Sequence, residues 1–145
     1  MFWKKKIIEE KRTVLFVDDE EAILRSLERG LIDESYNTLF ANSCKEALEI
    51  LQREEVHVII TDMRMPEMDG LEFIKILQKE YPHIIRMVLS GYGQEAALQT
   101  AVEQGEVFKV IPKPWKLREN FENIVRRAVD QYNLQNEREA VRQKN

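Results

Sequence analysis

Apolar side chains follow two alternating patterns along the chain. Short runs rich in β-branched and aromatic residues, bounded by polar residues, indicate buried strands at 13–17, 38–41, 56–62, 84–89 and 107–111. After each run, apolar residues recur three or four positions apart, which predicts amphipathic helices at 20–32, from Ser43, from Gly70, at 94–104 and from about Leu117. Strands that alternate with helices predict an α/β fold, a doubly wound five-stranded parallel sheet with helices on both faces.

Capping signals mark where several of these helices begin and end. Ser43 followed by Glu46 fits a capping box at a helix start, and Asp69 followed by Glu72 fits a second one. Gly105 stands where the helix at 94–104 should end, as expected of a residue in the C′ position. These signals leave a short loop with a proline directly after the third strand.

The composition indicates one soluble domain. A chain of 145 residues with 43% hydrophobic and 33% charged residues fits a single core, and no apolar run approaches the length that crosses a bilayer. Residues 1–12 lack the long apolar region and cleavage site of a signal peptide, and they form either a short helix or a leader without regular structure. Cys44 is the only cysteine, which excludes an intrachain disulfide. We therefore expect a cytoplasmic protein without membrane contact.

Charge is unevenly distributed along the chain. Residues 113–145 hold eight Lys or Arg and five Asp or Glu, whereas the whole chain has a net charge of −4. The excess of positive charge in residues 113–145 is small and fits a solvated helix face better than a nucleic-acid surface. We expect no direct contact with nucleic acid.

Polar residues stand where the predicted strands end. Asp18 and Asp19 follow the first strand, Asp62 ends the third, Ser90 follows the fourth and Lys113 follows the fifth. Taken singly, such residues are more often turn formers, helix caps or solvated strand ends. In a doubly wound sheet of order 2-1-3-4-5, however, the first and third strands are neighbours, and ligands bind at the carboxyl ends of the strands. The joint occurrence favours a binding site.

The chemistry of these groups narrows the kind of site. Three carboxylates at one edge repel one another, and Mg²⁺ relieves that repulsion while binding waters and phosphate oxygens. Ser90 adds a hydroxyl, and Lys113 adds a mobile positive charge that suits phosphate oxygens. The set is suited to phosphoryl transfer onto a carboxylate, with Asp62 as the nucleophile and an acyl phosphate as the product. No other cofactor is indicated.

Four segments, taken in order, resemble the receiver domain of two-component response regulators. They are Val17-Asp18-Asp19-Glu20, Asp62-Met63-Arg64-Met65-Pro66-Glu67-Met68-Asp69-Gly70, Leu89-Ser90-Gly91 and Lys113-Pro114-Trp115. The resemblance covers roughly residues 13–132 and implies a flavodoxin-like, three-layer receiver fold. Tyr92-Gly93 and Trp115 are most similar to receivers fused to HD-GYP phosphodiesterases or to hydrogenase-type transcription activators.

The resemblance implies a role for each candidate residue. Asp62 would accept a phosphoryl group from a sensor histidine kinase, Ser90 would follow that group, and Lys113 would contact it. The ligands of Mg²⁺ would be Asp18, Asp19, Asp62 and the backbone carbonyl of Arg64. Phosphorylation would then change the face made by helix 4, strand 5 and helix 5. The chain would be a regulatory domain that phosphorylates its own aspartate, and no enzyme with a separate substrate.

Two positions depart from the receiver pattern. Val110 stands where an aromatic residue is usual, and either Phe108 or Tyr92 replaces it or Phe108 is simply part of the core. Arg64 stands where a side chain tunes the lifetime of the phosphate. It either shields the phosphoryl group, or pairs with an acidic neighbour, or is exposed without effect on the lifetime. The alternative function is therefore a receiver-fold binding module that phosphorylation does not control. An aspartate-based phosphatase is disfavoured, because it needs a second aspartate at the position of Arg64.

Residues 133–145 continue beyond the region of resemblance. Leu134 and Val141 lie one heptad apart, which indicates a helical extension with weak coiled-coil character or a frayed tail. The division expected is a leader at 1–12, a receiver at 13–132 and this extension at 133–145. The expected partners are a sensor histidine kinase, a second copy bound through the last helices, and an output domain or partner protein outside this chain.

Overall fold

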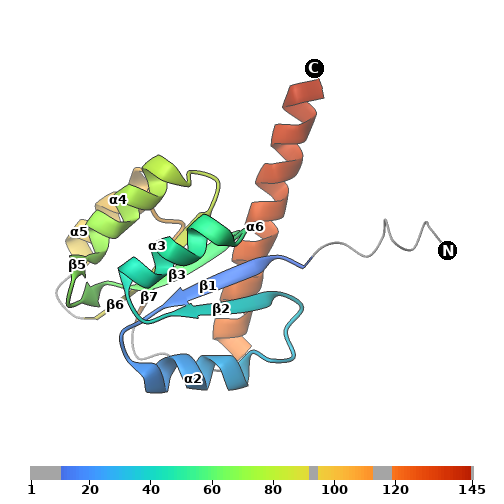
Figure 1. The fold of residues 1–145 in the computed structure, drawn as a ribbon. Coiled ribbons are helices and arrows are strands. Elements are labelled where there is room, and N and C mark those ends of the chain that lie inside the picture. The colour runs from blue at the N-terminus through green and yellow to red at the C-terminus, as the bar shows by residue number, and fades with distance from the viewer. Residues whose placement is uncertain (1–10, 92–94, 113–118, 145) are drawn as a thin grey trace.

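The computed structural model describes residues 11–91, 95–112 and 119–144, which form a five-stranded parallel sheet flanked by helices (Figure 1). In spatial order the strands are β2 (Asn37–Ala41), β1 (Thr13–Val17), β3 (Val58–Asp62), β6 (Ile85–Ser90) and β7 (Lys109–Pro112). The order of these strands is the predicted order 2-1-3-4-5. The predicted fold class is therefore confirmed.

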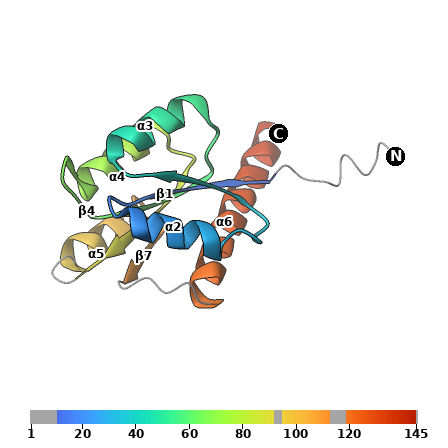
Figure 2. The ribbon, with the colours of Figure 1, turned by 60° about the horizontal axis from the view of Figure 1, so that its bottom comes forward.

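Helices cover both faces of the sheet, so the molecule has three layers (Figure 2). One face carries α3 (Cys44–Arg53), α4 (Gly70–Glu80) and α5 (Glu95–Glu103), and the other carries α2 (Glu21–Gly30) and α6 (Glu119–Lys144). Successive strand residues point to opposite faces. Leu15 and Ile59 are buried under the first group of helices, whereas Phe16 and Ile60 are buried under the second.

The segment after β3 differs from the prediction of a simple loop. It contains a small antiparallel hairpin whose strands are β4 (Arg64–Met65) and β5 (Met68–Asp69). Pro66 and Glu67 form its turn, and Met65 anchors it in the core. The pairing of Arg64 with Asp69 and of Met65 with Met68 gives this segment a defined shape.

The close approach of Gly70 to Met63 fixes the base of this hairpin. The Gly70 N–H donates to the Met63 carbonyl at 3.2 Å. A Cβ on Gly70 would lie 2.8 Å from the Met63 Cα, closer than real Cβ atoms come to other atoms, so only glycine fits. Gly105 has a different role, because its φ of 76° ends α5 as predicted.

Both predicted helix caps form, although each differs from the ideal capping box. Ser43 Oγ accepts from the Glu46 N–H at 3.0 Å, and Glu46 Oε1 accepts from the Asn42 N–H at 2.7 Å. The second bond therefore reaches one residue before the N-cap. At α4, Asp69 Oδ1 accepts at 3.1 Å from the Leu71 N–H, one residue before the donor that the capping box predicts.

Arg86 is a buried cation at the amino edge of the sheet, the edge at which the strands begin. Its Nε donates to the Glu106 carbonyl at 2.8 Å, and its Nη1 donates to the carbonyls of Ile84 at 2.9 Å and Pro82 at 3.4 Å. Burial lowers the pKa of the guanidinium, and the negative charge of Glu106 acts in the opposite direction. The side chain thus joins the segments that lead into β6 and β7.

His57 occupies the same edge and connects the sheet to α6. Its Nδ1 accepts from the Thr13 N–H at 2.9 Å, so the proton of the neutral ring is on Nε2, which lies 2.9 Å from Glu55 Oε1. The ring packs edge-on against Tyr132 of α6, with 4.8 Å between centroids. Arg12 completes the contact, because its guanidinium lies 5.1 Å from the centre of the Tyr132 ring.

Helix α6 continues well past the sheet (Figure 1). Its first half is held by Phe121, Val125 and Ala128, which are buried against the sheet. Beyond that, Leu134 is 42% exposed and Val141 is 59% exposed. Among the described residues, no helix combines the length and the apolar character that crossing a membrane requires.

Candidate functional site

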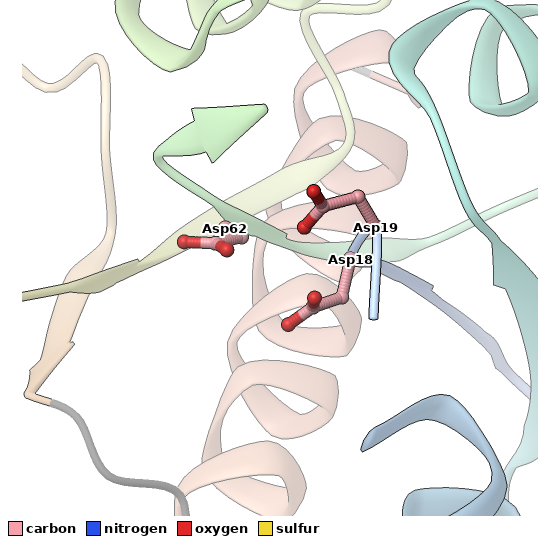
Figure 3. A group of neighbouring side chains, drawn as sticks. All are labelled: Asp18, Asp19 and Asp62. Carbon is pink, nitrogen blue, oxygen red and sulfur yellow. The ribbon is translucent and has the colours of Figure 1, made fainter. Parts of the chain in front are cut away.

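Three carboxylates gather at the carboxyl edge of the sheet, the edge at which the strands end (Figure 3). Asp62 is the last residue of β3, and Asp18 and Asp19 directly follow β1. One oxygen from each of the three side chains lies within 4.8 Å of the others. Asp18 is 1% exposed and Asp62 is 3% exposed, whereas Asp19 is open to solvent. The structure therefore brings together the three aspartates singled out from the sequence.

The sheet register explains why these side chains meet. Val17 of β1 pairs with Thr61 of β3, and the residue that follows each of them is an aspartate. Asp18 and Asp62 therefore lie at the same level along the strand direction. Asp18 is fixed further by its N–H, which donates to the Ala41 carbonyl at 3.1 Å. Asp18 Oδ1 accepts from the Glu20 N–H at 2.9 Å, and Asp62 Oδ1 accepts from the Arg64 N–H at 3.3 Å. Strand pairing and backbone donors thus fix the positions of both buried carboxylates.

The electrostatics of this cluster favour a bound cation. Carboxylates a few ångströms apart repel one another, and burial of two of them removes much of the water that would screen the repulsion. All three offer hard oxygen donors, which suit Mg²⁺, and the exposed Asp19 leaves the cluster open to solvent on one side. The donor set therefore fits a magnesium ion that keeps room for water or a phosphate oxygen.

Ser90 lies at the same edge, and Lys113 lies outside the described residues. Ser90 ends β6, is 7% exposed, and donates its hydroxyl to the Gly91 carbonyl at 3.0 Å. Its neighbour Leu89 pairs with Asp62, so Ser90 extends one residue farther along the edge. In β7, Pro112 pairs with Ser90 and is followed directly by Lys113. Tyr92 and Trp115 also fall outside the described residues.

Phe108 does not match the core role considered for it. The side chain is 41% exposed, so it is not part of the core. Its N–H donates to the Arg86 carbonyl at 2.7 Å, which places it at the amino edge, at the opposite end of β7 from Pro112. Val110 pairs with Val88 inside the sheet. The interpretation of Phe108 as a core residue is therefore wrong, because the strand predicted at 107–111 begins only at Lys109 and leaves Phe108 outside β7. The side chain of Arg64 is exposed.

Glu67 is a contact residue that the sequence did not indicate. From the turn of the hairpin, its Oε1 accepts from the Cys44 N–H at 3.0 Å, in the first turn of α3. The two residues are far apart in sequence, and the donor is a backbone group that every residue except proline carries. No local pattern could have identified this contact.

Comparisons with known proteins agree with this geometry. Residues 14–125 match the model of the response regulator receiver domain. The chain is 37% identical over 127 residues to the hydrogenase transcriptional regulatory protein HoxA of Cupriavidus necator, a match that covers 88% of the chain and 26% of HoxA. It is 31% identical over 126 residues to the DNA-binding transcriptional regulator NtrC of Proteus hauseri, which covers 87% of the chain and 26% of that relative.

A solved structure gives the same result. The signal receiver domain of an HD domain-containing protein from Pseudomonas fluorescens superposes with a TM-score of 0.78 at 27% identity, covering 86% of this chain and 98% of that one. The chain spans about a quarter of the length of the curated relatives named above, which are 26% covered. Because the family model matches most of its length, the chain belongs to the family of response regulator receiver domains.

Proposed function

We propose that phosphorylation of Asp62 by a sensor histidine kinase controls this receiver. The observation that carries the proposal is the position of Asp62, which is almost fully buried at a strand end and within 4.8 Å of two more carboxylates. In the transfer, the bond between phosphorus and the kinase histidine nitrogen breaks, and a bond to a carboxylate oxygen of Asp62 forms. The imidazole leaves with the electron pair, and the product is an acyl phosphate. We place this exchange in the cytoplasm, where ATP supplies the phosphate.

The ligands of the proposed Mg²⁺ would be Asp18, Asp19, Asp62 and the backbone carbonyl of Arg64. When bound, the ion would neutralise charge on the phosphoryl oxygens. The protein would hold the reacting carboxylates in place, because the register of β1 and β3 fixes them before the phosphodonor arrives. Asp19 would remain on the open side, where the phosphoryl group enters.

Ser90 and Lys113 would recognise the transferred group. The Ser90 hydroxyl now donates to the Gly91 carbonyl and would exchange that acceptor for a phosphoryl oxygen. Because Ser90 pairs with Pro112 in β7, its movement would reach β7 and the face that β7 shares with α5 and α6. Lys113 follows Pro112 directly and would supply a positive charge to the same group.

Labelling with a small phosphodonor tests the proposal. The chain is incubated with acetyl phosphate and Mg²⁺, and the mass gain is located by peptide mapping. We expect Asp62 to be labelled, and both Asp62→Asn and removal of Mg²⁺ to abolish the label. Asp69→Asn is the matched control, because Asp69 is an exposed carboxylate of the same hairpin that caps α4. Absence of label on the wild-type chain, or equal label on Asp62→Asn, would refute the proposal.

The exposed part of α6 suggests how the signal leaves the domain. With Leu134 and Val141 at the d positions of a heptad, Glu137 is a g residue and Arg142 is an e residue. In a parallel pair of helices, Glu137 of one copy would face Arg142 of the other. We propose that two copies associate through this segment and so pass the change to an output domain or partner protein.

The alternative function is a binding module that phosphorylation does not control. It is favoured by Val110, which replaces the usual aromatic residue, and by Phe108, which lies at the opposite edge of the sheet. Sedimentation of the chain with Mg²⁺, with and without beryllofluoride, separates the two functions. A change in association on adding beryllofluoride supports the switch. Beryllofluoride binding without any change in association or in partner binding supports the alternative.

A further inference from the structure

Glu67 connects the hairpin after Asp62 to helix α3. Its Oε1 accepts from the Cys44 N–H at 3.0 Å, although the two residues come from separate elements. The Cys44 thiol, which is fully buried, also lies within the influence of this carboxylate. Burial first, and then the charge and hydrogen bond of Glu67, raises the pKa of that thiol to about 12. One carboxylate therefore binds the backbone of Cys44 and acts on its thiol.

This contact provides an acceptor for an unpaired backbone N–H at the start of α3. The first N–H groups of a helix have no partner within it, and a negative charge near them is favourable. At this helix end, Ser43 accepts from the Glu46 N–H, and Glu46 accepts from the Asn42 N–H. A further donor of the first turn, the Cys44 N–H, is satisfied from outside the helix by Glu67. The end of α3 thus acts as an anchor point for the hairpin.

The hairpin carries the proposed carbonyl ligand of the metal. It is fixed at its base by the contact of Gly70 with Met63 and by the Arg64 N–H, which donates to Asp62 Oδ1. Both contacts lie beside Arg64, whereas Glu67 holds the opposite end, at the turn. Because β4 and β5 have only two residues each, a shift of the turn would tilt the whole hairpin and move the Arg64 carbonyl.

We propose that Glu67 is a positioning residue for the magnesium site, which it serves by holding the hairpin against α3. This inference rests on the proposed function, since it assumes that Mg²⁺ binds the aspartates with the Arg64 carbonyl. Glu67 would touch neither the metal nor the phosphoryl group. It would reduce the movement of one ligand before the metal arrives, as residues outside the ligand set do in other metal sites.

The test compares two glutamates at the same helix end. Glu67→Ala removes the acceptor of the Cys44 N–H, and Glu67→Gln keeps an amide oxygen there but removes its charge. Glu46→Ala and Glu46→Gln make the same two changes at a bond that stays within the α3 cap. Magnesium affinity is measured by isothermal titration calorimetry, and amide hydrogen exchange is followed across residues 64–69 without metal. We expect Glu67→Ala to weaken binding about tenfold, as loss of an outer partner typically does. Exchange should become faster, and Glu67→Gln should show a smaller loss of affinity.

Each outcome decides one question. Glu46→Ala should lose thermal stability and keep wild-type magnesium affinity, which separates positioning from general destabilisation. Wild-type affinity in both Glu67 variants would overturn the inference and leave the proposed function intact. A wild-type chain that binds no magnesium would overturn the proposed function itself, and the inference with it. If Glu67→Ala does not fold, as judged by circular dichroism, Glu67→Gln against Glu46→Gln still decides the question.

Discussion

The polar side chains buried at the amino edge of the sheet differ from those at the carboxyl edge in the sign and pairing of their charges. At the amino edge, Arg86 donates to three backbone carbonyls, and His57 accepts from one backbone N–H. At the carboxyl edge, the buried Asp18 and Asp62 have the same charge and lie within 4.8 Å of each other and of the exposed Asp19. Burial of polar groups is common to both edges, so burial alone does not identify a site.

The two edges should therefore contribute to the stability of the fold in opposite ways. Hydrogen bonds from Arg86 and to His57 join neighbouring segments, so these residues should stabilise the fold. Like charges at the carboxyl edge should oppose folding until a cation binds. Replacing Arg86 or His57 by an apolar residue should therefore lower the free energy of unfolding. Replacing Asp18 by an uncharged residue should raise it.

The largest effect is expected for Arg86→Met. This change keeps most of the apolar stem and leaves the buried carbonyls of Glu106 and Ile84 without a donor. The free energy of unfolding, measured with urea, should fall by about 3 kcal/mol. Arg53→Met, at an exposed position of α3, should change it little. A loss for Arg86→Met as small as that of the control would remove the contrast between the edges.

A smaller loss is expected for His57→Phe. The phenyl ring can still pack against Tyr132, but the Thr13 N–H loses its acceptor. The free energy of unfolding should fall by about 2 kcal/mol, while magnesium affinity stays unchanged. His83→Phe is the control, because His83 is exposed. Weaker magnesium binding in His57→Phe would show that the two edges are coupled, contrary to our view.

The opposite sign is expected for Asp18→Asn. The amide oxygen can still accept from the Glu20 N–H, so the change keeps this bond and removes the charge. Without metal the chain should gain about 1 kcal/mol, since one repelling charge is lost. Magnesium should bind at least about tenfold more weakly, so the increase in melting temperature on adding Mg²⁺ should shrink. Asp33→Asn, which removes an exposed charge, should show neither change, and a loss of stability in Asp18→Asn would contradict this account.

The carboxyl edge could be predicted from the sequence, whereas the amino edge could not. Parallel strands that alternate with helices fix which strand ends meet, so Asp18 and Asp62 could be placed together. Arg86 and Glu67 bind backbone groups, and a backbone group leaves no trace in the residue pattern. Phe108 is predicted inside a strand at 107–111, but β7 begins at Lys109, because an apolar run does not mark the first paired residue of a strand.

The buried thiol of Cys44 has a practical consequence for following the movement of α6. A protonated, fully buried thiol reacts slowly with maleimides at neutral pH, and the chain has no other cysteine. An Asn136→Cys variant, changed at an exposed f position outside the proposed contact, would therefore carry a spin label or fluorophore selectively. Distances between two such labels would report directly whether phosphorylation brings the exposed ends of two α6 helices together.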